Sequence, residues 1–184
     1  MGPRLKLVLL AALFGLPIAA SILAYKFMRP DPTANFGELL LPPAELPAQE
    51  FSTRAGKRFT FADLAGKWIL VASDSGECAA PCQQKLATLR QVRLALGRNA
   101  SRVERVFVVD DQRPPDAGML ADFSGMTVAL MPAGLRVPAG VASDRGHVYL
   151  VDPRGNVMMR WPSATEGKRL LSDLQRLLKA SQIG

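Results

Sequence analysis

Apolar residues in this chain form one long run near the N-terminus and a series of shorter, periodic runs after residue 50. The long run covers residues 7–25, contains 19 residues without a formal charge, and is flanked by Arg4 and Lys6 on one side and Lys26 and Arg29 on the other. An apolar helix needs about 20 residues to cross a hydrocarbon core of about 30 Å. Residues 1–29 are therefore predicted to be a single transmembrane anchor.

A cleaved signal peptide is the alternative for this segment, but its apolar region is usually about 7–15 residues long. The run here is longer, and it ends in Tyr-Lys-Phe-Met-Arg-Pro rather than in small residues. These features favour a retained anchor. The short N-terminal tail favours an N-terminus in the cytoplasm, with the rest of the chain exported.

Prolines punctuate residues 30–50, at positions 30, 32, 42, 43 and 47. Because proline prevents a continuous helix and favours extended chain, this segment is predicted to be a semi-rigid, Pro-rich linker. The folded domain is expected over residues 51–184.

The runs after residue 50 switch between strand and helix periodicity. They predict a hairpin over 51–61, strands over 67–73, 103–109 and 127–131, helices over 81–96 and 116–123, a strand pair over 147–161, and a final helix. Ser163 and Glu166 stand at capping-box spacing and are expected to begin that helix. This order predicts an α/β sandwich, with a central mixed sheet flanked by helices.

Charge adds one exclusion. The net charge is +7, but residues 1–29 contribute four basic groups and no acids, which leaves 19 basic against 16 acidic residues in the rest of the chain. Because no dense basic run is present, nucleic acid is not an expected partner. Asp110 and Asp111, at the end of a predicted strand, are expected to be solvated turn acids.

The chain contains two cysteines, Cys78 and Cys82, at the junction between a predicted strand and a predicted helix. A helix N-terminus stabilises a thiolate through its dipole and its free N–H groups. In the first turn of a helix, residues four apart face the same way, with Cα atoms about 6 Å apart. The pair is therefore expected either to close as a disulfide or to bind one soft metal ion, with Cys78 the more exposed of the two.

Three further segments carry a resemblance. Leu64-Ala-Gly-Lys-Trp-Ile-Leu-Val71 before the cysteines resembles the thioredoxin superfamily, and the spacing Cys78-x-x-x-Cys82 is similar to the Sco/SenC family. Val106-Phe-Val-Val-Asp-Asp-Gln-Arg113 and Tyr149-Leu-Val-Asp-Pro-Arg-Gly155 resemble a strand and a hairpin of that family. The Sco/SenC proteins are membrane-anchored, copper-binding proteins that help to assemble cytochrome c oxidase. The resemblance implies a thioredoxin-like fold.

The resemblance also implies a metal site, since the Sco/SenC proteins bind copper through two cysteines and a distal histidine. That histidine normally lies eight residues before the hairpin aspartate, where this chain has Asp144, whereas its one histidine, His147, lies five residues before Asp152. By this resemblance Cys78, Cys82 and His147 are the expected copper ligands. Two thiolates and an imidazole suit Cu(I), and an ordinary loop histidine is the alternative for His147.

Three functions remain open. The first is assistance to cytochrome c oxidase assembly, by copper delivery or by thiol redox at the cysteine pair, with a membrane-embedded oxidase subunit as partner. The second is a general thiol-disulfide oxidoreductase acting on other exported thiol proteins, with Cys78 attacking and Cys82 resolving. The third is a non-catalytic docking relative with a structural disulfide. A lone cysteine pair beyond an anchor fits a periplasmic domain on the bacterial inner membrane.

Overall fold

The computed structural model describes residues 2–27, 35–46, 49–111, 113–132 and 141–181, and it divides the chain into two compact units, residues 1–34 and 35–184. The first unit contains α1 (Pro3–Phe27), a helix whose described side chains are exposed along its whole length. Residues Pro3–Ala24 are long and apolar enough to cross a membrane. The helix therefore fits a membrane anchor, as the sequence predicts.

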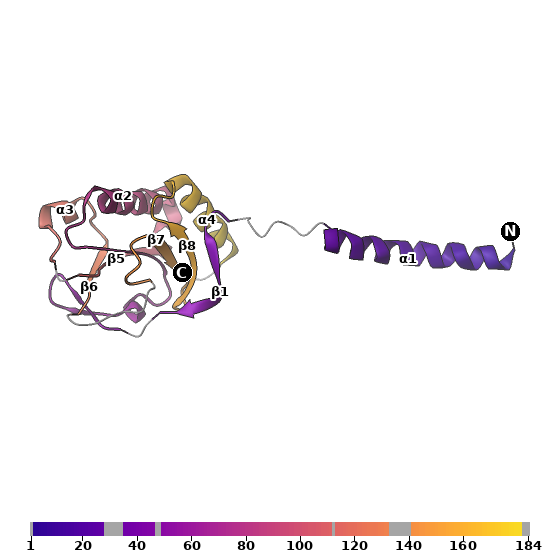
Figure 1. The fold of residues 1–184 in the computed structure, drawn as a ribbon, viewed down its shortest axis with the longest axis horizontal. Helices are drawn as coiled ribbons and strands as arrows, with labels where there is room; N and C mark the ends of the chain where they lie inside the picture. The colour runs from indigo at the N-terminus through magenta and orange to yellow at the C-terminus, as the bar shows by residue number, and fades with distance from the viewer. Residues whose placement is uncertain (1, 28–34, 47–48, 112, 133–140, 182–184) are drawn as a thin grey trace. The chain divides into compact units, whose positions relative to one another are not determined.

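The second unit is built on one mixed sheet of eight strands in the order β1-β8-β7-β4-β5-β6-β2-β3 (Figure 1). The central strands β4, β5 and β6 run parallel, and the other neighbouring pairs are antiparallel. This arrangement confirms the predicted central mixed sheet. The strands are β1 (Glu38–Glu45), β2 (Phe51–Thr53), β3 (Arg58–Phe59), β4 (Trp68–Asp74), β5 (Val103–Val109), β6 (Thr127–Leu130), β7 (His147–Val151) and β8 (Asn156–Pro162).

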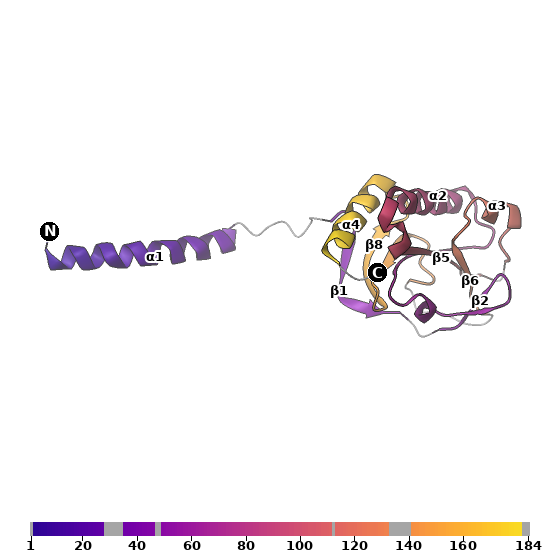
Figure 2. The ribbon, with the colours of Figure 1, turned by 180° about the vertical axis from the view of Figure 1, so that it is seen from behind.

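Helices cover one face of this sheet. They are α2 (Ala80–Ala95), α3 (Ala117–Ala121) and α4 (Gly167–Ala180), with short 3-10 turns η1 (Phe61–Leu64) and η2 (Gly97–Arg102) between elements. Both views of the ribbon place α2 and α4 on the same side of the strands (Figures 1 and 2). The predicted elements after residue 50 are thus all present, within a few residues of their expected ends.

The alternation of β4 divides the core into two layers. Leu70 and Ala72 pack on the helix side together with Phe107 and Trp161. Ile69 and Val71 of the same strand pack on the other side. No residue of a described α-helix belongs to this second layer; it contains the aromatic side chains Phe51, Phe59 and Phe61 of the hairpin and η1 instead. Because both faces are covered, β4 is a nearly continuous apolar run.

The expected linker over residues 30–50 requires a correction, since part of it belongs to the folded unit. Strand β1 pairs antiparallel with β8, with Leu39 opposite Met159. The carboxylate of Asp173 on α4 accepts hydrogen bonds from the backbone N–H groups of Phe36 and Gly37 and from Trp161 Nε1. Prolines are tolerated in β1 because it is an edge strand with an irregular register. Residues 30–34 and 47–48 lie outside the described residues.

The predicted capping box of the last helix is wrong. Helix α4 begins at Gly167, its N-cap residue is Glu166, and no side chain caps it. The backbone of Ser163 instead donates to the carbonyl of Gly146, and Thr165 donates to the carbonyl of Pro162. Ser163 therefore follows the end of strand β8 and contacts the loop before β7, and it lies too early in the chain to cap the helix.

Candidate functional site

The candidate site lies where the central parallel strands end. Strands β4 and β5 are paired in register up to Asp74 and Val109, so the loops that follow them leave the same edge of the sheet. The loop after β4 carries Cys78 and leads into α2, which carries Cys82, and the loop after β5 carries Asp110 and Asp111. The C-terminal edge of parallel strands is the usual place for ligand and redox sites in α/β folds.

Cys78 and Cys82 are joined in a disulfide, with their Cα atoms 5.1 Å apart. This is one of the two arrangements that their spacing left open. Cys82 lies in the first turn of α2, as expected, but Cys78 lies two residues before the helix and has a positive φ of 40°. The pair is therefore brought together by a left-handed backbone turn, which a residue other than glycine adopts only under constraint.

The expectation that Cys78 is the more exposed cysteine is wrong. Cys78 is fully buried and Cys82 is 2% exposed, and both belong to the core layer on the helix side. The physical reason is that the loop after β4 folds back against the loop after β5. An attacking group can reach either sulfur only when the side chains that cover the pair move.

Asp111 holds this loop in place. Its carboxylate accepts hydrogen bonds from Ser75 Oγ at 2.5 Å, from the N–H of Gly76 at 3.0 Å and from the N–H of Arg113 at 3.1 Å. Burial acts to raise the pKa of Asp111, but these hydrogen bonds and the charge of Arg145 together lower it below its ordinary value.

The two loops touch at Gly76. A Cβ atom at this position would lie 1.7 Å from the carbonyl oxygen of Arg113. Any residue other than glycine would therefore clash with the backbone of Arg113 unless that backbone moved. The side chain of Arg113 also forms an ion pair with Glu77. The loop that precedes Cys78 is thus fixed by a glycine contact as well as by a carboxylate.

Lys85 is a site residue that sequence reasoning missed. It lies one turn after Cys82 on α2, and only 3% of the residue is exposed. Its Nζ donates to the carbonyl oxygen of Ser73 at 2.8 Å, to Asp74 Oδ2 at 2.9 Å and to the carbonyl oxygen of Arg145 at 3.1 Å. Lys85 therefore ties the cysteine helix to the end of β4 and to the loop before β7. The sequence did contain a sign of this role, because Lys85 stands next to Leu86 on the face of the predicted helix that carries Cys82.

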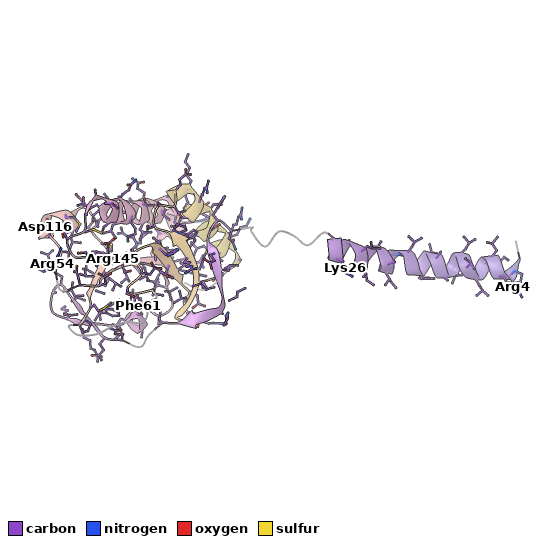
Figure 3. The ribbon with its side chains drawn as sticks, in the orientation of Figure 1. Arg4, Lys26, Arg54, Phe61, Asp116 and Arg145 are labelled. Atoms are coloured by element: carbon purple, nitrogen blue, oxygen red, sulfur yellow. A yellow bond between two sulfur atoms is a disulfide. The ribbon has the colours of Figure 1, made fainter. Side chains whose placement is uncertain are left out.

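Asp110 is not a solvated turn acid either. Its carboxylate receives two hydrogen bonds from the guanidinium of Arg145, at 2.7 and 2.5 Å, and its own side chain is 8% exposed. The side chain of Arg145 is 49% exposed, and in Figure 3 it lies near the middle of the face of the domain that is turned to the viewer. This bidentate pair joins the loop after β5 to the loop before β7. Asp110 and Asp111 thus hold the loop before β7 and the loop after β4, respectively, against the loop after β5.

His147, the first residue of β7, is held by the residue that occupies the histidine position of the Sco/SenC pattern. His147 Nδ1 lies 2.7 Å from Asp144 Oδ2, and the hydroxyl of Tyr149 donates to the same oxygen at 2.6 Å. Burial opposes the charge on Asp144, but hydrogen bonds from Tyr149, Gly146 and His147 lower its pKa. Burial and the bond to Asp144 raise the pKa of Tyr149 to about 12.

The described residues contain no group of three or more His, Cys, Asp or Glu side chains placed to hold a metal ion. Cys78, Cys82 and His147 are all described, so the expected copper ligands are not assembled while the disulfide is closed. The donor chemistry still fits, because reduction releases two thiolates. A histidine held through one nitrogen by a carboxylate is the usual form of a metal ligand. Copper ligation by this set stays a prediction.

A shallow hollow of about 540 Å³ borders the first turns of α2. It is lined by Pro81, Gln84, Thr88, Thr165 and Lys168, among others. Pro81 is the neighbour of Cys82 in the chain. Another hollow of about 490 Å³ lies against η1 and the β7–β8 turn and contains neither cysteine. Of these two hollows, the one beside the start of α2 is thus adjacent in sequence to a cysteine of the pair.

A family model described as "transmembrane-like, thioredoxin-like, C-terminal domain" matches residues 68–181. The chain belongs to this family. The matched segment includes the disulfide, Lys85 and His147 and extends from β4 through α4. None of the curated proteins matches the sequence.

Solved structures give the same fold. Apo Sco1 from Thermus thermophilus is 17% identical, with a TM-score of 0.64, and the match covers 80% of this chain and 99% of that one. Yeast Sco1 with copper bound is 17% identical, with a TM-score of 0.62, covering 76% and 95%. The thioredoxin domain of a thiol-disulfide oxidoreductase from Bacteroides vulgatus is 18% identical, with a TM-score of 0.56, covering 73% and 96%. The predicted thioredoxin-like, Sco-like fold of this family member is thereby confirmed.

Proposed function

We propose that this protein is a membrane-anchored assembly factor for cytochrome c oxidase that works by reversible thiol–disulfide exchange at Cys78 and Cys82. The observation that carries the proposal is the disulfide itself, placed at the start of α2 and at the C-terminal edge of a thioredoxin-like sheet. The resemblance to the Sco/SenC family supports the oxidase as the client. The bacterial inner membrane is the proposed location, with α1 as a retained anchor and the domain in the periplasm.

The exchange transfers two electrons from the reduced pair to a client disulfide. One thiolate of the pair attacks a client sulfur, which forms a mixed disulfide and releases the other client sulfur as a thiolate. The second cysteine of the pair then attacks the mixed disulfide. The client leaves as a dithiol, and the Cys78–Cys82 disulfide is restored. Because Cys82 lies in the first turn of α2, the helix N-terminus stabilises its thiolate during this cycle.

Copper delivery is a second candidate, favoured by the contact between His147 Nδ1 and Asp144. In this mode Cu(I) is the cargo, held by the reduced cysteines and by Nε2 of His147, the ring nitrogen that Asp144 does not hold. The same reduced state serves both modes. A client that needs its own cysteines reduced before it receives copper would use both in turn.

Two alternatives are separated from this proposal by measurement. A general oxidoreductase would exchange with any exported thiol protein and would show no preference for an oxidase subunit. A structural disulfide is favoured by the burial of both cysteines, and it would resist reduction. Structural disulfides have reduction potentials below about −300 mV, whereas catalytic ones lie higher.

The test uses the full chain in detergent or in membranes. The reduction potential of the Cys78–Cys82 pair is measured against glutathione buffers, and the Cys82→Ser variant is mixed with a peptide from an oxidase copper site in its disulfide form. We expect a potential above about −300 mV and a trapped mixed disulfide between Cys78 and the peptide. Ser52→Ala, which alters an exposed serine of β2 outside the site and leaves both cysteines in place, serves as the control and should trap nothing.

A reduction potential below about −300 mV, with no mixed disulfide trapped by either Cys82→Ser or Cys78→Ser, would refute the redox function. Titration of the reduced chain with Cu(I) tests the second candidate separately. It predicts one ion per chain, weaker binding in His147→Ala, and unchanged binding in Lys67→Met, which alters a lysine outside the site. Equal affinity in His147→Ala and the parent would exclude the three-ligand site.

A further inference from the structure

The outer face of α4 is strongly basic. Four of its side chains are exposed and positively charged: Lys168, Arg169, Arg176 and Lys179. The one carboxylate of this helix, Asp173, is fully buried and engaged with backbone N–H groups. The helix therefore presents basic side chains outward without an acidic group of its own among them.

Exposed apolar side chains lie beside this helix. Phe36 is 55% exposed and Leu39 is 39% exposed. The guanidinium of Arg169 lies 5.4 Å from the centre of the Phe36 ring, so the basic and apolar groups are in contact. Both ribbon views show β1 next to α4 (Figures 1 and 2).

Strand geometry places Leu39 on the same side of the sheet as α4. Leu39 is paired with Met159, whose side chain belongs to the core layer on the helix side. Leu40, the next residue, packs against the opposite layer. We call the four basic residues of α4 together with Phe36 and Leu39 the α4–β1 face.

Within the described part of the chain, two exposed carboxylates border this face, and each is paired with a cation. Glu166 lies 3.9 Å from Arg169, and Glu38 lies 2.8 Å from Arg160. Of the three cations Lys168, Arg169 and Lys179, Glu166 offsets one, and the pair between Glu38 and Arg160 offsets none. The α4–β1 face therefore keeps a net positive charge.

The chain connects this face closely to α1. Helix α1 ends at Phe27 and the second unit begins at Asn35, so residues 28–34 separate them. A chain segment of any conformation spans at most about 3.6 Å per residue. The end of α1 and the start of the second unit are therefore at most about 30 Å apart. If α1 is embedded in a membrane, this tether keeps the α4–β1 face at a high effective concentration near the lipid surface.

We propose that the α4–β1 face docks on the anionic headgroup surface of the membrane that holds α1. Lysine and arginine side chains are attracted to anionic lipids within about a Debye length of the surface. Exposed aromatic and aliphatic side chains enter the boundary between headgroups and acyl chains. This inference rests on the proposed role of α1 as a retained anchor. Docking restricts rotation of the domain about its tether, so the disulfide keeps one orientation toward a membrane-embedded client.

The test uses the full chain in lipid nanodiscs. Leu39→Cys is labelled with an environment-sensitive fluorophore, because the native cysteines are bonded to each other and buried. Nanodiscs of phosphatidylcholine alone are compared with nanodiscs that contain phosphatidylglycerol, and both contain spin-labelled lipid as a quencher. We expect strong quenching with phosphatidylglycerol, severalfold weaker quenching in phosphatidylcholine, and loss of quenching at high salt.

Charge reversal supplies the matched pair of variants. Lys168→Glu with Lys179→Glu, on the α4–β1 face, should reduce quenching severalfold. Arg54→Glu with Lys57→Glu makes the same charge change on the exposed β2–β3 hairpin, at the opposite edge of the sheet from β1. Arg54 lies at the far end of the domain from β1 (Figure 3). This control should leave quenching unchanged.

The outcomes separate this proposal from the one on which it rests. A chain that does not enter nanodiscs at all overturns the anchor. A chain that enters them but shows no quenching in anionic lipid, or equal quenching in both lipids, overturns docking. Equal effects of the two charge reversals also overturn it, because the attraction would then depend on total charge and not on this face.

Discussion

Lys85 gives the sharpest test of how the site is built. Replacement of Lys85 by Met keeps most of the side-chain volume but removes the ammonium group, whose Nζ donates to Asp74, Ser73 and Arg145. The side chain of Lys85 is 2% exposed and that of Asp74 is 19% exposed. The variant therefore leaves a largely buried carboxylate and two carbonyl groups without their charged partner.

Removal of one partner from a buried ion pair costs about 3–5 kcal/mol in free energy of unfolding. We expect a loss of about 3 kcal/mol, at the lower end of this range, because Asp74 keeps some solvent contact and the N–H of Ser75 at 2.9 Å. With a urea dependence of about 2 kcal/mol per molar, the unfolding midpoint should fall by about 1.5 M. The assay is urea unfolding of residues 35–184, which form one compact unit.

Two further variants decide whether the reasoning holds. Asp74→Asn combined with Lys85→Met removes both charges, so it should be more stable than Lys85→Met alone. Lys67→Met is the control, since Lys67 also donates to a backbone carbonyl, that of Ser101, but in an exposed setting; its loss should stay within about 0.5 kcal/mol. A loss below about 1 kcal/mol in Lys85→Met, or additive losses in the double variant, would refute this account.

Three other expectations follow from contacts of single residues. Asp173→Ala should lower the free energy of unfolding by about 3 kcal/mol and release β1, because three donors, two of them buried, lose their acceptor. Hydrogen exchange of β1 amides measures this, and unchanged protection would contradict it. Gly76→Ala should displace the cysteine loop from Arg113 and make the disulfide more accessible. The rate of reduction by a small dithiol should rise, and an unchanged rate would count against the close contact. The pKa of Asp111 is lower in the folded protein than the ordinary carboxyl value of 3.8. The ionised carboxylate therefore stabilises the fold fully when the pH is above 3.8, and this stabilisation is lost as the pH falls below 3.8 and through the lowered pKa. The difference in urea midpoint between the parent and Asp111→Asn should therefore shrink on acidification from pH 7, whereas a constant difference would show that the charge of Asp111 is not involved.

The order of elements was predictable because each one leaves a local period in the sequence. The apolar run of β4, the helical spacing of α2 and the turn between β7 and β8 all lie within short windows of chain. Strand β1 was missed for the opposite reason. Its prolines have the local signature of a linker, and only its pairing with β8, more than one hundred residues away, makes it a strand.

The cysteine pair shows where the same limit falls within the site. Sequence spacing placed Cys78 and Cys82 within bonding distance, because four residues at a helix start allow few other arrangements. Their burial depends on Gly76 and Asp111, which belong to different loops, so no local pattern could reveal that Cys78 is covered. The contact between His147 and Asp144 was equally unpredictable, because the comparison with the Sco/SenC motif gave only the position of Asp144 in the sequence.

The sequence by itself thus determined an anchor-length helix, the succession of strands and helices, and a close pair of thiols. Tertiary structure alone decided that Lys85 joins three segments at the site, that the disulfide is enclosed, and that basic and apolar side chains of α4 and β1 share one face. The physical reason is the same in each case. Periodicity records how a residue relates to its neighbours along the chain, whereas burial, ion pairing and surface charge depend on residues that only folding brings together.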